Sequence, residues 1–279
     1  MTRIESASSI NTYRNCARKY FYHYKLGLPT KDSIAALNGG VVHTALENFF
    51  KIDPANLHFN TYENELRNHL MNSFNQAWIE VVPQLSALTE SKDTIKDYYQ
   101  DSLFMLDHFV SIFLKKLQEE MNKKSLTEAF NTIKPETEIC ITSATHQIRG
   151  YIDAIHKNDG EILILDYKTS RSDEVTEDYK LQLAIYVLLF EEQQGKMPDK
   201  VGLYFLRHGQ QKLIPVTPEL IAFAKKECKN VHNNTISQDI EDYPKNLGPL
   251  CKWCDYKDYC FGQKSLSDYT LLKEQAHNG

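Results

Sequence analysis

The most restrictive feature of the sequence is a change in hydrophobic periodicity at Pro135. Before it, apolar residues recur at helical spacing in one stripe from Leu66 to Trp78 and in another from Ile95 to Leu117. Both stripes predict helices that face a core rather than a cofactor. After Pro135, short apolar segments alternate with turn-forming residues, which is typical of strands. Helices followed by a β-β-β-α-β order predict a mixed α/β core with a helical insertion.

Turn-forming and capping residues divide the chain into the expected elements. Helices are expected over 9–26, from about 39, over 176–193, and from Thr217 with Pro218 in its first turn. Strands are expected in ETEICITSA, HQIRGYIDAIHK and EILILDYKT, with a turn at Asn158-Asp159-Gly160, and in VGLYFLRHG and QQKLIPV. We therefore divide the chain into N-terminal helices (1–52), a helical insertion (53–130), an α/β core (131–232) and a C-terminal cysteine segment (233–279).

Composition favours a cytoplasmic globular protein. The chain has 279 residues, of which 42% are hydrophobic and 25% charged, and these are ordinary values. No apolar run approaches the roughly 20 residues that cross a bilayer, so no membrane partner is expected. The first residues also lack the apolar core of a signal peptide.

Charge is distributed unevenly, although the net charge is only −5. Residues 1–31 hold six basic side chains against one acid, so the remainder carries −10. A local basic surface attracts phosphates even on an acidic protein, because salt limits the field to about 8–10 Å. A merely solvated charged helix would give the same pattern.

An acidic pair and a lysine follow two neighbouring strands. Asp166 and Lys168 end the apolar run ILIL, and alternation places them on one face of the strand with Tyr167 on the other. Asp153 lies on the preceding strand, where pairing would bring its carboxylate near Asp166. Two acids with the Tyr167 carbonyl suit Mg²⁺ or Mn²⁺, while Lys168 positions a water or stabilises developing charge. A triplet of this kind alone is weak evidence, since exposed strands carry such charges too.

Two predicted helices supply further polar candidates. His43 follows Gly39-Gly40 and could give a nitrogen ligand, although a lone helical histidine is usually a packing or surface residue. Glu47, one turn later, is better explained as a helix-stabilising charge. Gln182 and Tyr186 share a helical face within an apolar stretch. They either border the site, touching DNA or Lys168, or Gln182 is a satisfied buried amide.

The cysteines predict a metal centre. Cys251-x2-Cys254-x5-Cys260 is a compact trio that suits zinc or an iron–sulfur cluster, and spacing alone does not choose between them. Cys16 is the best fourth ligand, although it is distant in sequence. Disulfides are not expected in a cytoplasmic chain. Cys140, on a strand, and Cys228, on a helix, are predicted to be buried core residues.

Together these motifs resemble the RecB-like branch of the PD-(D/E)XK nuclease superfamily. The matching segments are SSINTYRNCARKYFYHY, GGVVHTALE, RGYIDAI, ILDYKTS, QLAIYVLLF and CKWCDYKDYC, in that order. The resemblance is strongest to iron–sulfur members such as the AddB nuclease domain and CRISPR-associated exonucleases. It implies a restriction-endonuclease-like core, which is a mixed central sheet flanked by helices.

The resemblance also implies roles for individual residues. The metal ligands would be His43, Asp153, Asp166 and the Tyr167 carbonyl, and the catalytic residues Lys168, Asp166 and Asp153. A [4Fe-4S] cluster, favoured over zinc, would be held by Cys16, Cys251, Cys254 and Cys260. DNA contacts would come from Gln182, Tyr186, Arg14, Arg18, Lys19 and Tyr20.

Three functions are compatible with this reading. The first is a Mg²⁺- or Mn²⁺-dependent deoxyribonuclease, for which an exonuclease on single strands is favoured over an endonuclease. Such an enzyme would act in DNA repair, recombination or CRISPR adaptation, and the sequence does not identify a helicase or adaptation partner. The second is an iron–sulfur DNA-binding or assembly subunit whose nuclease site is unused. The third is an enzyme with zinc at the cysteines and structural acids.

Overall fold

The fold is known from a computed structural model that describes residues 3–89, 91–158 and 160–266. Its contacts divide the chain into two units, one formed by residues 1–31 with 227–279 and the other by residues 32–226. Cys16 therefore falls in the first unit and His43 in the second, although the sequence division grouped them. Asp159 and residues 267–279, which belong to the predicted turn and C-terminal segment, lie outside the described residues.

The larger unit contains a five-stranded sheet in the order β1-β2-β3-β4-β5. The strands are β1 (Glu136–Ser143), β2 (Ile148–Asn158), β3 (Glu161–Lys168), β4 (Lys200–Phe205) and β5 (Gln210–Ile214). Only β3 and β4 pair in parallel, because α7 (Glu177–Gln194) connects them; the other neighbours are antiparallel. The mixed α/β sheet predicted from the sequence is thus confirmed.

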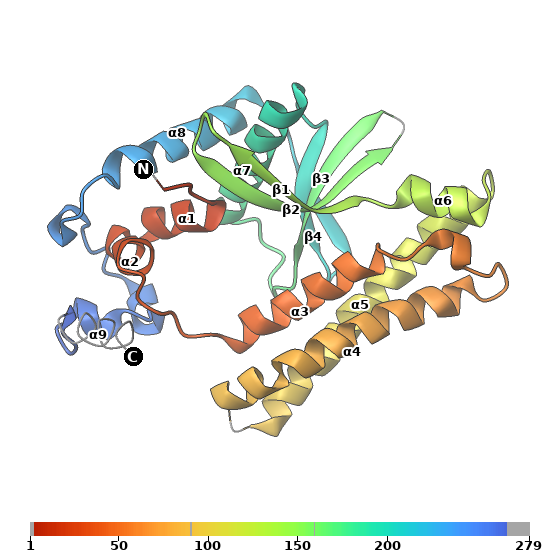
Figure 1. The fold of residues 1–279 in the computed structure, drawn as a ribbon, viewed down its shortest axis with the longest axis horizontal. Helices are drawn as coiled ribbons and strands as arrows, with labels where there is room; N and C mark the ends of the chain where they lie inside the picture. The colour runs from red at the N-terminus through yellow and green to blue at the C-terminus, as the bar shows by residue number, and fades with distance from the viewer. Residues whose placement is uncertain (1–2, 90, 159, 267–279) are drawn as a thin grey trace, which may run out of the picture. The chain divides into compact units, whose positions relative to one another are not determined.

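Helices cover both faces of this sheet (Figure 1). On one face lies α7, whose middle is buried all round. On the other lie α3 (Ile34–Phe49), α4 (Tyr62–Leu88), α5 (Lys92–Met121) and α6 (Leu126–Ile133), with a 3₁₀ turn, η2 (Pro54–Asn56), between α3 and α4. The predicted stripes of α4 and α5 join one apolar core with Leu165 and Tyr167 of β3. Burial of these stripes fixes the long hairpin against α3.

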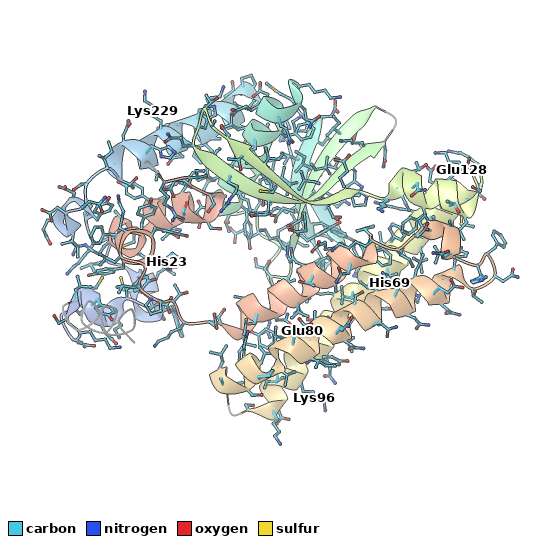
Figure 2. The ribbon with its side chains drawn as sticks, in the orientation of Figure 1. His23, His69, Glu80, Lys96, Glu128 and Lys229 are labelled. Carbon is cyan, nitrogen blue, oxygen red and sulfur yellow. The ribbon has the colours of Figure 1, made fainter. Side chains whose placement is uncertain are left out.

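Local capping explains where several of these helices begin. α3 starts at the Ser33 cap, whose hydroxyl accepts the Ala36 amide at 3.1 Å, rather than near Gly39 as the sequence predicted. On α4, His69, which is labelled in Figure 2, donates from Nε2 to the Asn48 carbonyl of α3 at 3.0 Å. In the parts of the chain that the structure describes, no helix has both the length and the hydrophobicity that crossing a bilayer requires.

The smaller unit brings N-terminal and C-terminal segments together. It contains α1 (Ala7–Asn15), α2 (Ala17–Tyr20) and a π-helical turn, η1 (Phe21–Lys25). Its later part holds η3 (Ile240–Asp242), η4 (Pro249–Trp253) and α9 (Lys257–Cys260), after α8 (Pro218–Asn234), which begins in the larger unit. Tyr256 joins the two parts, because its hydroxyl donates to the Leu28 carbonyl at 3.0 Å.

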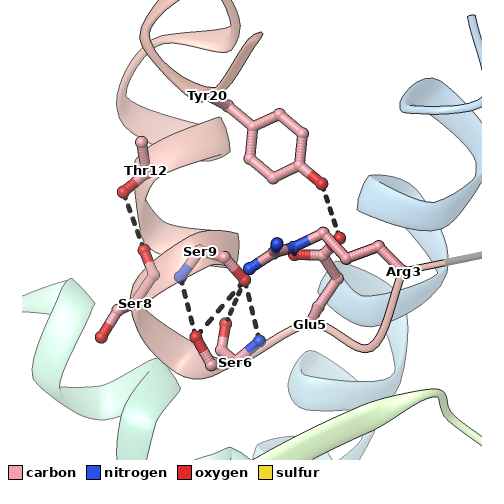
Figure 3. Close-up of polar contacts among 7 residues, drawn as sticks. All are labelled: Arg3, Glu5, Ser6, Ser8, Ser9, Thr12 and Tyr20. Carbon is pink, nitrogen blue, oxygen red and sulfur yellow. Dashed lines mark hydrogen bonds and ion pairs between the residues drawn. The ribbon is translucent and has the colours of Figure 1, made fainter. Parts of the chain in front are cut away.

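The single N-terminal helix expected over 9–26 is interrupted at Cys16. Its backbone is extended, with φ −164° and ψ 111°, so α1 ends there and α2 begins. A reciprocal capping box between Ser6 and Ser9 starts α1 (Figure 3). Gly27, at φ +67°, follows the last turn, as the sequence predicted.

Candidate functional site

Strand alternation sorts the three residues at the end of β3. Tyr167 is buried in the core that packs on the helical hairpin, whereas Asp166 and Lys168 contact α7 on the opposite face. Lys168 Nζ lies 2.6 Å from Asp166 Oδ2 and donates to Gln182 Oε1 at 2.8 Å. The ammonium also lies 4.5 Å from the centre of the Tyr179 ring. Three side-chain contacts thus fix the position of this cation.

The register of β2 and β3 places Asp153 next to this pair. Ala154 pairs with Leu165, so continued pairing would set Asp153 opposite Asp166. The ladder ends instead, and the Asp153 carboxylate accepts the main-chain N–H of Tyr167 at 2.7 Å. The two acids thus lie at the point where β2 and β3 separate.

Asp166 is almost fully buried, at 2% exposure. Burial and then the Asp153 charge raise the pKa of its carboxyl, whereas Lys168 works in the opposite direction. Its Oδ1 also accepts the Tyr186 hydroxyl at 3.3 Å. The carboxylate is therefore held by one cation and one hydroxyl in a site that disfavours negative charge.

Helix α7 supplies a connected pair of polar side chains to the site. Gln182 Nε2 donates to the Tyr186 hydroxyl at 2.9 Å, so the amide links Lys168 to Tyr186. α7 can approach β2 because position 150 is glycine: a Cβ there would lie 2.8 Å from Leu189 Cδ1 and 3.2 Å from a Tyr186 ring carbon. Of the two sequence-based alternatives for Gln182, the structure shows the contact with Lys168.

His43 reaches the same point from α3. Its Nδ1 lies 3.4 Å from Asp153 Oδ2. Burial alone would lower the pKa of His43, but the hydrogen bond and charge of Asp153 raise it overall. α3 passes close to the end of β3 at Gly39, where an added Cβ would be in ordinary van der Waals contact with Thr169 Oγ1, at 3.4 Å. Glu47 pairs with Lys51 at 2.7 Å along the same helix, which is the stabilising role expected of it.

Glu138 is a site residue that the sequence analysis missed. It lies on β1 opposite Asp153, between the registered pairs Thr137–Ala154 and Ile139–Ile152. Its backbone adopts φ +52°, which is uncommon for a residue other than glycine and is often found at functional sites. Burial and then the Asp153 charge raise the pKa of its carboxyl. Only the register and this backbone conformation identify it, because an isolated glutamate on a strand carries no sequence signal.

A compact set of possible metal ligands results. One ligand atom each from His43, Glu138 and Asp153 lie within 4.8 Å of one another, and this is the one such set of three within the described ranges 3–89, 91–158 and 160–266. Asp166 is outside this set, because its oxygens face Lys168 and Tyr186. The structure thus brings together the predicted His43 and Asp153 and adds Glu138, with Asp166 as a close neighbour.

In the smaller unit, the four predicted cluster cysteines line one cavity of about 530 Å³. They are Cys16, Cys251, Cys254 and Cys260. Burial raises the pKa of the Cys260 thiol, and the Cys254 and Cys16 thiols add to the increase while a Tyr22 hydrogen bond opposes it. The interruption of the helix at Cys16 thus occurs at the residue that joins the C-terminal trio.

The two remaining cysteines differ from each other. Cys228 is buried, as predicted, and burial raises the pKa of its thiol to about 12. Cys140 is exposed, so the prediction that it is a core residue is wrong. On β1, at the sheet edge, alternation turns Ile141 into the core and Cys140 away from it.

The predicted N-terminal DNA contacts also lie in the smaller unit. The Tyr20 hydroxyl donates to Glu5 at 2.5 Å (Figure 3), and its side chain is 1% exposed. Arg18 is buried too and donates from Nε to the Tyr243 carbonyl at 2.7 Å. Arg14 pairs with Glu227 at 3.4 Å, and Lys19 lines the cysteine cavity. Burial of Tyr20 and Arg18 favours a structural role for both.

Two strands that carry acids and a lysine, beside a helical histidine on a mixed sheet, define a nuclease core. The chain matches the family model described as the PD-(D/E)XK nuclease superfamily over residues 5–261, and it belongs to that superfamily.

Two known structures show a distant likeness to this chain. A crystal structure of a candidate exonuclease from Eubacterium rectale is 13% identical, with a TM-score of 0.49, over 91% of this chain and 87% of that one. The protein solved as SSO0001 is 19% identical, with a TM-score of 0.32, over 67% of this chain and 82% of its own. No curated protein matches the chain.

Proposed function

We propose that the chain is a metal-dependent deoxyribonuclease of the RecB-like, iron–sulfur type, and that it acts as an exonuclease on single strands. The observation that carries this proposal is the fixed position of Lys168 Nζ, 2.6 Å from a buried acid and beside a compact ligand set. A solvated charge pair would not be buried and held in this way. The resemblance adds the preference for single-strand ends and a role in DNA repair, recombination or CRISPR adaptation, and the composition favours a cytoplasmic location.

The donor set fits a hard divalent cation. Carboxylate oxygens suit Mg²⁺ and Mn²⁺, and the set contains two carboxylates beside one imidazole. His43, Glu138 and Asp153 would hold such an ion, with Asp166 and the Tyr167 carbonyl as further candidates. When bound, the ion would neutralise charge on the scissile phosphate and activate a water nucleophile.

The chain's own residues explain the remaining chemistry. Lys168 places a fixed positive charge where charge develops on the phosphate, and a preorganised cation is more effective there than in water. Gln182 and Tyr179 keep the ammonium in position. Tyr186 donates to Asp166, so this acid is oriented before any substrate binds.

A comparison of two lysines tests the proposal. Lys168→Met and Asp166→Asn should each lower the turnover of end-labelled single-stranded DNA at least about 100-fold, with Mg²⁺ or Mn²⁺. The matched control is Lys180→Met, because Lys180 lies on α7 and pairs with Glu177 at 2.6 Å. Comparing single-stranded with double-stranded DNA gives the strand preference, and comparing 5′-labelled with 3′-labelled substrates gives the polarity of cleavage. Equal turnover in all three variants would refute the proposal.

We also propose that the cysteine cavity holds a [4Fe-4S] cluster. Four thiols around one cavity supply the ligands that a cubane needs. Four thiols would also suit a tetrahedral zinc site, and the resemblance to iron–sulfur members of the family is what favours the cluster over zinc.

Anaerobic purification tests the cluster. Iron and acid-labile sulfide, each near four per chain, and a visible absorption band are expected. Cys16→Ser should remove the band, whereas Cys140→Ser, at an exposed cysteine outside the cavity, should keep it. A colourless protein with one zinc per chain would refute the cluster while leaving the nuclease proposal intact.

A further inference from the structure

A cavity in the larger unit opens beside Lys168. Its volume is about 690 Å³, and its walls come from α3, the end of β3, α5 and the turn after β4. Gly40 of α3 lines the cavity, and a Cβ there would meet nothing within 4 Å. His43 and Lys168 also line the cavity, so a strand cleaved at the proposed site would pass through it.

The size of this cavity limits what enters it. Sites of roughly 300–1,000 Å³ hold ligands the size of a drug molecule or a nucleotide. A stacked duplex is much wider than such a cavity, whereas one or two unstacked nucleotides fit. The wall from α5 belongs to the helical hairpin, so this insertion shapes the entrance to the site.

Charge at the entrance favours a phosphate. Asp101 of α5 would repel DNA by itself, but Arg207 binds it through two nitrogens, at 3.1 Å and 2.8 Å. The Arg207 hydrogen bond is the main reason that the pKa of Asp101 is lowered. Arg171 lies 4.0 Å from the same carboxylate and its side chain is 79% exposed. The carboxylate is therefore neutralised by Arg207, and Arg171 remains as an exposed positive charge.

An aromatic ring completes the wall. Tyr98 of α5 lines the cavity, is half-buried, and has no ring contact with another aromatic residue among the described ones. The Tyr179 ring, by contrast, lies against Lys168. Single-strand sites commonly combine a cation that tracks the backbone with a ring on which a base stacks.

We propose that this cavity binds the single strand next to the scissile bond, with Arg171 on a backbone phosphate and Tyr98 stacked on a base. The choice of DNA as the ligand rests on the proposed function. The Asp101–Arg207 pair acts as a positioning element, because it ties α5 to the turn after β4 at the cavity.

Equilibrium binding tests this inference without turnover. The probe is a fluorescein-labelled oligothymidylate, and anisotropy is measured in EDTA over a series of salt concentrations. Arg171→Gln should weaken binding. It should also reduce the slope of log affinity against log salt concentration by about 0.7, which is the effect of losing one phosphate contact on a single strand. Tyr98→Leu should weaken binding about 5- to 100-fold with the slope unchanged.

Matched controls lie on the same unit outside the cavity. Arg67→Gln removes an arginine of α4 that pairs with Asp107 at 2.6 Å, and Tyr151→Leu removes a 52% exposed tyrosine of β2. Both should bind the probe as the wild type does. A thermal melt of each variant separates lost binding from lost folding, and Arg171→Lys should restore the slope.

The outcomes separate this inference from the nuclease proposal. Wild-type affinity and slope in both cavity variants, or no binding by the wild type, would overturn the inference even if the protein cleaves DNA. Weakened binding in both variants would support it even if cleavage is never observed, and then only the nuclease proposal would fail.

Discussion

The Asp153 carboxylate accepts the main-chain N–H of Tyr167 at 2.7 Å, so a side chain of the site takes the place of a main-chain hydrogen bond between two strands. The β2–β3 ladder ends at Ala154 and Leu165. Without this hydrogen bond, a buried amide at the end of β3 would lack an acceptor, which costs about 1–3 kcal/mol. Asp153 therefore contributes to stability as well as to the proposed metal site.

Two substitutions at Asp153 separate these contributions. Asp153→Asn keeps an oxygen for the Tyr167 amide, so we expect the free energy of unfolding to change by less than about 1 kcal/mol. Asp153→Ala removes the acceptor and should lower that free energy by about 1–3 kcal/mol. Both should weaken Mn²⁺ binding. Denaturant unfolding without metal, and Mn²⁺ titration, measure the two effects; equal stability of the variants would contradict the structural role.

Two glycines should respond to alanine in opposite directions. Gly150→Ala places a Cβ 2.8 Å from Leu189 Cδ1, so overpacking should destabilise the fold by about 1–3 kcal/mol. Gly40→Ala meets nothing within 4 Å on α3 and should stabilise it by up to about 1 kcal/mol, because alanine favours a helix. Urea midpoints of the two variants check both signs, and a stabilised Gly150→Ala would show that α7 does not pack closely on β2.

Glu138 gives a prediction that depends on the proposed metal site. Glu138→Gln removes one carboxylate from the compact set and should weaken Mn²⁺ binding at least about 10-fold. Glu136→Gln is the matched control, because that exposed acid on the same strand pairs with Lys157 at 2.7 Å. Equal affinity of the two variants would exclude Glu138 as a ligand.

Proton competition should make metal binding depend on pH. Burial, and then the charge of Asp153, raise the pKa values of Glu138 and Asp166. Asp153 also raises the pKa of His43, against the effect of burial. An ion must displace any proton bound at its ligands, so Mn²⁺ affinity should rise as pH increases from the acid range to neutrality. Calorimetry in buffers of different ionisation enthalpy measures the protons released, and release independent of pH would contradict this mechanism.

The sequence predicted the residues whose place depends on local pattern. Strand alternation correctly separated Asp166 and Lys168 from Tyr167, and the helical stripes identified the hairpin. Pairing of adjacent strands also placed Asp153 near Asp166. Each of these inferences needs only the period of one element or the order of two neighbours.

Other features depend on tertiary contacts that local pattern does not record. Glu138 becomes a site residue through the β1–β2 register and its φ of +52°. The break at Cys16 occurs without proline or glycine. α3 begins at the Ser33 cap and continues through Gly39 and Gly40, so the Gly-Gly pair does not mark the start of the helix.

His156 of β2 provides a last prediction, on stability. Burial and then the Lys116 charge lower the pKa of this histidine to about 4 from an ordinary value of 6.5. Between pH 6.5 and 4 the unfolded chain binds a proton that the folded protein does not. The contribution of His156 to the free energy of unfolding is therefore complete above pH 6.5. It is lost as the pH falls to about 4 and does not change further below that pH.

The non-titrating variant His156→Gln isolates this effect, because contributions from the other acids and bases cancel in the difference between the two proteins. The wild type should lose up to about 3 kcal/mol more than the variant between pH 7 and pH 4. Urea unfolding at several pH values measures that difference. If the difference in unfolding free energy between the two proteins does not change over this range, His156 is protonated within the fold. That result would contradict a buried neutral ring.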